Sequence, residues 1–197
     1  MKERGMIFNG GMVRAILDGR KTQTRRPIKP QPELTARSGF SWNGRLFGAG
    51  IDERETNRNF AHTACPHGKP GDRIWVRETF SAVPDQDEPA GCSAILYAAD
   101  GGKPYGKWTP SIHMPRDACR ILLEITDVRV ERLNSICDLD ASKEGCSIAD
   151  MGSGDCLADV FAGLWSSIYG AENWQANPWV WVIEFKVVPS VQTGSTE

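Results

Sequence analysis

Two long segments of this chain alternate apolar and polar residues, and this period of two constrains the fold more than any other feature. In residues 178–188 the apolar side chains share one face: Trp179, Trp181, Ile183, Phe185 and Val187. In residues 120–132 they change phase: Ile121, Leu123 and Ile125 hold one phase, whereas Val128 and Val130 hold the other. A change of phase near Thr126 predicts a β-bulge or bend. We therefore expect two long strands in a small, strongly curved sheet that closes into a barrel.

Helical patterns lie between shorter strand candidates. Residues 10–18 follow the helix capping residue Asn9 and stop at Gly19. Residues 138–144 predict a short helix, and apolar residues at helical spacing predict an amphipathic helix over 157–168. Further strands are expected at 6–8, 22–26, 73–78 and 94–98. The fold class is therefore α+β, a small mixed β-barrel flanked by helices.

The length of 197 residues and the composition fit one domain. We assign residues 1–188 to it, with long loop insertions at about 27–70 and 81–117, and residues 189–197 to a flexible polar tail. No apolar run approaches the roughly 18 residues that span a bilayer, and no apolar stretch follows the charged N-terminus. We expect a cytoplasmic protein with no membrane partner. The net charge of -2 excludes nucleic-acid binding by bulk charge alone, but not a local basic site.

The six cysteines form no C-x-x-C pair, so the sequence shows no disulfide framework. The nearest approach to a metal cluster is His62, Cys65 and His67, which Cys92 or His113 would have to complete. The paired ligand spacing of zinc sites is absent. We therefore predict no obligatory metal and no other cofactor. The phosphate-binding and nucleophile-elbow motifs of nucleotide hydrolases, dehydrogenases and α/β-hydrolases are also absent.

A basic run at residues 20–29 is the densest chemical signal in the chain. It holds five basic residues and no acidic one: Arg20, Lys21, Arg25, Arg26 and Lys29. Arginine offers planar forks to phosphates or base edges, whereas lysine is a compact charge whose pKa falls on burial. The run is therefore an anion-site candidate. The alternative is a solvated basic turn without a ligand.

Several motifs resemble the ASCH-domain family, whose members are PUA-like β-barrels related to RNA-binding modules. They are Gly-Arg-Lys-Thr at 19–22 with Thr24 and Arg25, the Gly-Asp strand entry in 69–78, and Val-Ile-Glu-Phe-Lys at 182–186. Residues 112–116 and 125–128 are similar to a subgroup common in tailed phages and prophages. The resemblance implies a PUA-like barrel with a cleft over it.

The resemblance also implies chemistry. Bacterial members similar in the Gly-Arg-Lys-Thr region are amidohydrolases that deacetylate N4-acetylcytidine with a lysine, a threonine and a glutamate. These match Lys21, Thr24 and Glu144 here. Other ASCH proteins resemble ribonucleases or non-catalytic nucleic-acid binders, so the expected partner is a nucleoside or single-stranded RNA or DNA.

Physical chemistry sets conditions on this trio. A threonine hydroxyl is a weak nucleophile without an adjacent base, and Lys21 can act as one if its pKa falls. Lys21 and Thr24 converge only if Lys21 lies in the turn, because residues three apart on a strand face opposite sides. Glu144 shuttles the proton only if the helix end packs over the cleft. The alternative is a solvated glutamate at a helix end.

Further residues are candidates for substrate or nucleic-acid binding: Arg20, Arg25, Arg26, Arg77, Glu78 and Trp108. Glu78 shares the phase of Ile74 and Val76, so it points inward as another acid or base if Lys21 or Arg25 pairs with it. Its alternative is an exposed position past the barrel rim. Trp108 lies in a loop near lysines and is the better base-stacking candidate among the tryptophans.

Overall fold

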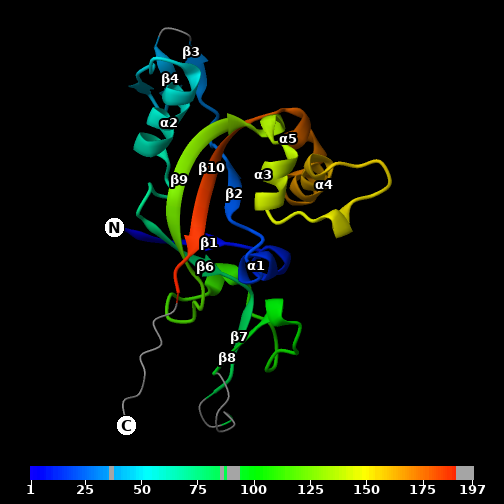
Figure 1. Cartoon of the computed structure of the whole chain (residues 1–197). Helices are drawn as coiled ribbons and strands as arrows, with labels where there is room; N and C mark the ends of the chain where they lie inside the picture. Colours follow the sequence, from blue (N-terminus) through cyan, green and yellow to red (C-terminus); the bar gives the residue numbers. More distant parts are fainter. Residues whose placement is uncertain (36–37, 85–86, 88–93, 190–197) are drawn as a thin grey trace.

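A five-stranded mixed sheet forms the centre of the molecule (Figure 1). The computed structural model describes residues 1–35, 38–84, 87 and 94–189. The strand order is β1 (Glu3–Ile7), β6 (Arg73–Arg77), β9 (Leu122–Arg132), β10 (Trp179–Val187) and β2 (Gln23–Pro27). β1 and β6 are parallel, and the other neighbours are antiparallel. With its helices, the chain has the α+β fold class that the sequence predicts.

The two long strands pair along their length and contain the predicted irregularity. Glu184 of β10 lies opposite Asp127, but the next residue, Phe185, lies opposite Ile125. Thr126 is thus the extra residue of a bulge, and this explains the change of phase in the sequence. Figure 1 shows β9 and β10 curving together through the molecule.

The described strands leave the sheet open, so the closed barrel is not confirmed. β1 and β2 form its two edges and share no ladder. A side-chain hydrogen bond links these edges, in which Arg26 Nη2 donates to the carbonyl of Ile7 at 2.6 Å.

Side chains on both faces of β10 are buried, although the sequence predicted one apolar face. Trp181 and Ile183 pack in the main core with residues of α1 (Gly10–Leu17) and α2 (Glu53–Ala64). Val180 and Val182 pack on the other face, against α3 (Asp138–Lys143) and α4 (Leu157–Tyr169). The short helix α5 (Ala171–Gln175) follows α4. Because α3 and α4 cover this second face of β10, its residues are apolar. A strand face in contact with solvent would carry polar residues instead.

Both predicted insertions have structure of their own. The first holds a small sheet of β3 (Glu33–Thr35), β4 (Gly39–Trp42) and β5 (Arg45–Phe47), followed by α2. Its aromatic rings join the main core, with Phe40 stacked on Phe60 at 4.5 Å between centroids. The second insertion contains the hairpin of β7 (Phe80–Ala82) and β8 (Ile95–Tyr97). These two insertions form two lobes, which lie at opposite ends of the sheet in Figure 1.

Other element bounds differ from the expected ones by few residues. β1 begins earlier than the expected strand 6–8, and α1 ends at Leu17. Asn9 caps α1 as predicted, because its side chain accepts a hydrogen bond from Met12 N at 2.9 Å. Among the helices of the described residues, none combines the length and apolar character needed to cross a bilayer.

Candidate active site

Lys21 lies in the turn between α1 and β2, which meets the condition that the sequence set. β2 begins at Gln23, and the Lys21 backbone N–H donates to Ala15 at the end of α1 at 2.8 Å. The side chain runs inward and has no exposed surface. Its Nζ donates to Glu144 twice, to the backbone carbonyl at 2.8 Å and to carboxylate Oε2 at 2.7 Å.

Glu144 is the C-cap residue of α3, directly after Lys143, and its side chain is only 3% exposed. The alternative of a solvated glutamate is therefore wrong. The other carboxylate oxygen, Oε1, accepts a hydrogen bond from Arg25 Nη1 at 3.2 Å. Each oxygen of Glu144 thus contacts a different buried cation, and the helix end packs over the sheet as the proton-shuttle hypothesis requires.

Burial lowers the pKa of Lys21 below its ordinary value of 10.5, and this effect exceeds the opposing attraction of Glu144. The nearby positive charge of Arg26 lowers this pKa further, whereas Cys146 raises it. A lysine with a lowered pKa can release its proton and accept one from a substrate or nucleophile. Lys21 is therefore chemically suited to act as a base.

Thr24 is a buried residue of β2 and lines a cavity of about 180 Å³. Glu144 also lines this cavity, whereas Lys21 lies behind Glu144. Side chains from β1, α1 and α4 form apolar walls: Ile7, Met12, Phe161, Leu164, Trp165, Ile168 and Tyr169. In the described residues the Thr24 hydroxyl makes no hydrogen bond to Lys21 or Glu144. Such contacts often tighten only once a substrate is bound.

A second cavity of about 450 Å³ adjoins the first. The two share four lining residues, Asn9, Met12, Glu144 and Leu164. The second cavity is more polar, since Arg14, Asp18, Arg20 and Asp150 line it. Glu144 thus stands where an apolar cavity meets a polar one.

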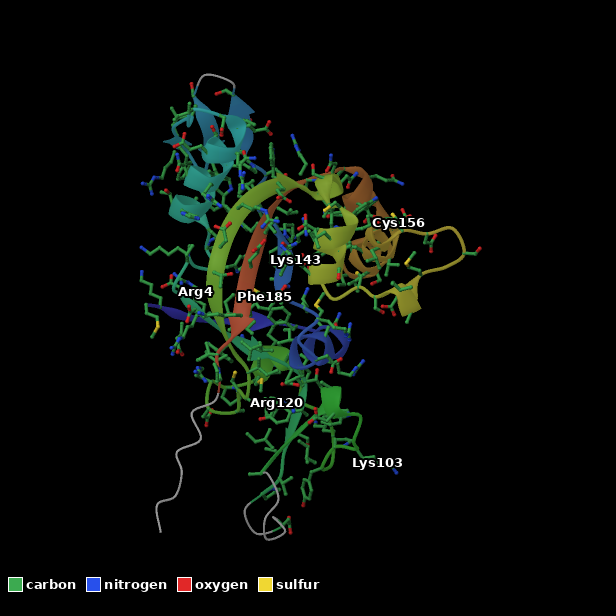
Figure 2. The ribbon with its side chains drawn as sticks, in the orientation of Figure 1. Arg4, Lys103, Arg120, Lys143, Cys156 and Phe185 are labelled. Carbon is green, nitrogen blue, oxygen red and sulfur yellow. The ribbon has the colours of Figure 1, made fainter. Side chains whose placement is uncertain are left out.

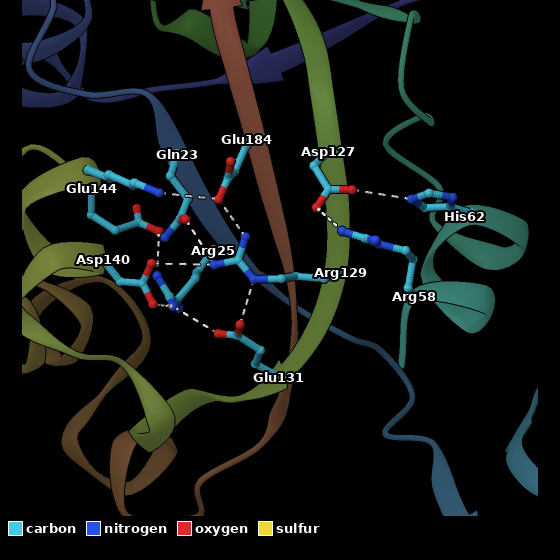
Figure 3. Close-up of polar contacts among 11 residues, drawn as sticks. Gln23, Arg25, Arg58, His62, Asp127, Arg129, Glu131, Asp140, Glu144 and Glu184 are labelled. Atoms are coloured by element: carbon cyan, nitrogen blue, oxygen red, sulfur yellow. Dashed lines mark hydrogen bonds and ion pairs between the residues drawn. The ribbon is translucent and has the colours of Figure 1, made fainter. Parts of the chain in front are cut away.

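Arg25 belongs to an ion-pair network between α3 and the sheet (Figure 3). Its Nη2 donates to Glu131 of β9 at 3.0 Å and to Asp140 of α3 at 3.1 Å. Arg129 of β9 continues the network to Glu131, Asp140, Glu184 and Gln23. Arg25, which the sequence predicted as a ligand-binding residue, lines the cavity of about 180 Å³ together with Arg26, while its terminal nitrogens contact carboxylates.

Arg20 and Arg26 of the basic run also have internal partners. Arg20 donates to the carbonyl of Gly145 at 2.9 Å and to Asp18 at 3.1 Å. Arg26 lies 5.1 Å over the ring of Phe8 and bonds to the backbone of Ile7. The alternative of a solvated turn is therefore wrong for Lys21 and Arg25. Of the five basic residues, only Lys29 is exposed and makes no hydrogen bond or ion pair within the described residues.

Glu78 lies in a different polar centre. It points inward with 1% of its surface exposed, so the exposed alternative is wrong. Its partner, however, is Arg120, at 2.9 and 3.0 Å, and not Lys21 or Arg25. Figure 2 shows Arg120 apart from Lys143, the last residue of α3. The condition for Glu78 as another acid or base at this site, a pair with Lys21 or Arg25, is therefore not met.

Arg77 and Trp108 do not line either cavity. The Arg77 guanidinium lies 5.3 Å over the ring of Trp75 and donates to the carbonyl of Ile112. Trp108 is half-buried in the lobe of β7, next to the bridge that Thr109 makes with Phe80. Neither residue lies in the candidate site.

The metal-cluster candidates are dispersed. His62 contacts Asp127 at 3.4 Å, and burial raises the pKa of Cys65 to about 11. Cys92 lies outside the described residues. In the part of the chain that the structure describes, no group of three or more His, Cys, Asp or Glu side chains is placed to hold a metal.

The aromatic wall of the cavity was missed at the sequence level. Phe161, Trp165 and Tyr169 are four residues apart on α4, and this spacing predicts one helix face. The pattern indicated a packed core face, and Phe161 and Trp165 are indeed buried. The sequence contains no signal that the same face borders a cavity.

Comparisons with known proteins place the chain in no family. No family model matches the sequence, and no curated protein matches it. A solved structure, that of protein EF3133 from Enterococcus faecalis V583, family-model DUF984, matches with a TM-score of 0.42 and 12% identity. The match covers 95% of this chain and 81% of that chain.

Proposed function

We propose that this protein is an amidohydrolase that removes the acyl group from an N4-acylated cytidine-like nucleoside, on an ASCH-type, PUA-like fold. One observation carries the proposal: a fully buried lysine with a lowered pKa contacts Glu144 at the floor of a cavity that Thr24 also lines. Perturbed ionisable groups at the floor of a cavity are typical of catalytic sites.

Each residue has a definite role in the proposed reaction. Glu144 relays the proton of the Thr24 hydroxyl to neutral Lys21 as the Thr24 oxygen attacks the acyl carbonyl carbon. The bond from this carbon to N4 then breaks, and Glu144 transfers the proton to the leaving nitrogen. Water hydrolyses the resulting threonine ester and releases the acid. Glu144 suits the transfer because it lies between Lys21 and the cavity.

The shape and lining of the cavity favour a small planar substrate. Its volume of about 180 Å³ is below the roughly 300–1,000 Å³ typical of drug-sized ligands. Phe161 and Tyr169 offer ring surface to a heterocyclic base. A single acylated base fits such a space better than a polymer segment.

The binding-module and ribonuclease alternatives depend on basic residues that are free to contact phosphates. In the basic run the terminal nitrogens of Arg25 face carboxylates, and Lys21 is paired with Glu144. A nucleic-acid polymer would gain few phosphate contacts there. Its binding would weaken steeply with salt, whereas hydrolysis of a nucleoside would not.

The test is incubation of the protein with N4-acetylcytidine and short RNAs, followed by mass spectrometry. We expect cytidine and acetate from the nucleoside and intact RNA. Lys21→Arg and Thr24→Val should each lower kcat/KM by roughly 10²–10⁴-fold, because arginine cannot act as a base and valine has no hydroxyl.

The matched control is Lys186→Arg, an exposed lysine of β10, which should keep wild-type activity. Full activity of Lys21→Arg would eliminate Lys21 as the base. Absence of product from acylated nucleosides at every pH would refute the amidohydrolase, and cleaved RNA would favour a ribonuclease.

A further inference from the structure

Arg25 connects the carboxylate of Glu144 to other carboxylates of β9 and α3. Its Nη1 contacts Glu144 Oε1 at 3.2 Å, while Nη2 is held between Glu131 and Asp140 at 3.0 and 3.1 Å. These carboxylates come from β9 and α3, so the guanidinium has fixed contacts on two elements. The ring of Phe161 lies 5.8 Å from the guanidinium carbon and covers it.

This arrangement fixes how Glu144 meets Lys21. A carboxylate with one oxygen bonded to a held arginine cannot rotate freely about its last bonds. Its second oxygen then stays directed at Lys21 Nζ, at 2.7 Å. A planar guanidinium with several fixed donors suits this task better than a flexible ammonium group.

Charge in the network is balanced when Lys21 is protonated. Four cations, Lys21, Arg25, Arg129 and Lys143, form ion pairs with four carboxylates, Glu131, Asp140, Glu144 and Glu184. Two further groups affect the pKa of Lys21: Arg26 lowers it and Cys146 raises it. If Lys21 loses its proton, Glu144 still has Arg25 as its counter-ion. Without Arg25, Lys21 would be the sole cation in contact with Glu144.

We propose that Arg25 is a positioning residue, which holds Glu144 toward Lys21 and serves as its second counter-ion so that Lys21 is free to exchange its proton. The part that Arg25 plays in catalysis rests on the proposed function. Its contacts with Glu144 do not depend on which substrate binds. Arg25 also lines the smaller cavity, so this positioning role stands beside the ligand-binding role that the sequence predicts for it.

The experiment compares Arg25→Met, Arg25→Lys and Asp140→Asn. Removing the positive charge of Arg25 strengthens the hold of Glu144 on a protonated Lys21, so the titration midpoint of Lys21 should rise. We expect a rise of roughly one pH unit or more in Arg25→Met, corresponding to about a tenfold change in proton affinity. Asp140→Asn removes a negative charge while Arg25 stays charged and free to bond Glu144 more fully, so the Lys21 midpoint should fall in this variant.

Two readouts distinguish the possible results. The ¹³C NMR titration of the Lys21 Cε resonance, assigned by its loss in Lys21→Arg, needs no substrate. The pH profile of kcat on N4-acetylcytidine should move in parallel, with activity recovered at high pH. If wild type has no hydrolytic activity but the NMR midpoint moves, the positioning role stands and the proposed function fails.

The matched control is Arg120→Lys, which weakens the other buried arginine–glutamate pair, with Glu78. It should lower the unfolding midpoint and leave the Lys21 titration in place. An unchanged Lys21 midpoint in both Arg25→Met and Asp140→Asn would overturn the proposal. If Arg25→Met does not fold, Arg25→Lys and Asp140→Asn decide the question by the same titration.

Discussion

A lysine that leaves water loses most of its hydration, and the protein must replace this with hydrogen bonds and a counter-ion. Lys21 receives both from one residue, since Glu144 offers its backbone carbonyl and its carboxylate. The backbone contact is insensitive to substitution of the side chain. A substitution of the Glu144 side chain therefore removes the counter-ion of Lys21 but keeps the hydrogen bond from Lys21 to the backbone carbonyl.

The buried glutamates Glu144 and Glu78 lead to a prediction about their independence. Glu144→Gln leaves Lys21 and Arg25 without their shared anion, and Glu78→Gln does the same to Arg120. Each change should lower the free energy of unfolding by about 3–5 kcal/mol. Because the pairs share no partner, the double variant should show the sum within about 0.5 kcal/mol in urea unfolding.

A different result would change the description of the site. Coupling well above 1 kcal/mol between Glu78 and Glu144 would indicate that the two polar centres act together. Glu78 would then gain support as another acid or base of the reaction.

The end of α3 approaches α1 so closely that Gly145 is required there. Its φ of +97° lies in the region that favours glycine, and a Cβ would meet Ala15 Cβ at 2.9 Å and Lys21 Cβ at 3.3 Å. Gly145→Ala should destabilise the protein by about 1–3 kcal/mol through strain and overlap. It should also lower hydrolytic activity, because Lys21 would have to move.

Gly163 in α4 is the matched control for this substitution. Its side-chain position is open, with no atom within 4 Å, and it lies inside a helix. Gly163→Ala should raise stability by about 0.4–1 kcal/mol, since alanine restricts the unfolded chain and favours helix. Thermal unfolding of both variants gives the comparison, and equal shifts of the midpoint for both would contradict it.

The sequence predicted well those features whose structure is determined by one local pattern of residues. The bulge at Thr126 follows from apolar phase, and the cap of α1 follows from Asn9. Local patterns did not predict the partners of side chains that contact residues distant in the sequence. The partner of Glu78 lies 42 positions away, and Arg25 looked like a solvent-facing cation because no signal in β2 reveals carboxylates on β9 and α3. The cavity wall on α4 was hidden for the same reason.

At the scale of the whole molecule, the curved sheet connects two lobes and a helical layer. α3 and α4 cover one face of β10, and the first insertion contributes α2 and its aromatic rings to the other. The candidate site lies where the helical layer meets β2 and α1. The segment that leads from α2 back into β6 contains His67, whose environment makes the stability of the molecule depend on pH.

Burial lowers the pKa of His67 from 6.5 to about 4, with smaller effects from Arg26 and Arg4. Below pH 6.5 the unfolded chain therefore binds a proton that the folded chain does not, and stability falls as the pH falls toward 4. His67→Gln removes this linkage. Between pH 7.5 and 4.5 the wild type should lose about 1–3 kcal/mol more than the variant in urea unfolding, an amount reduced by the partial exposure of the ring. Parallel pH dependences for the two proteins would show that His67 takes up its proton equally well in the folded state, and would contradict the burial of its imidazole.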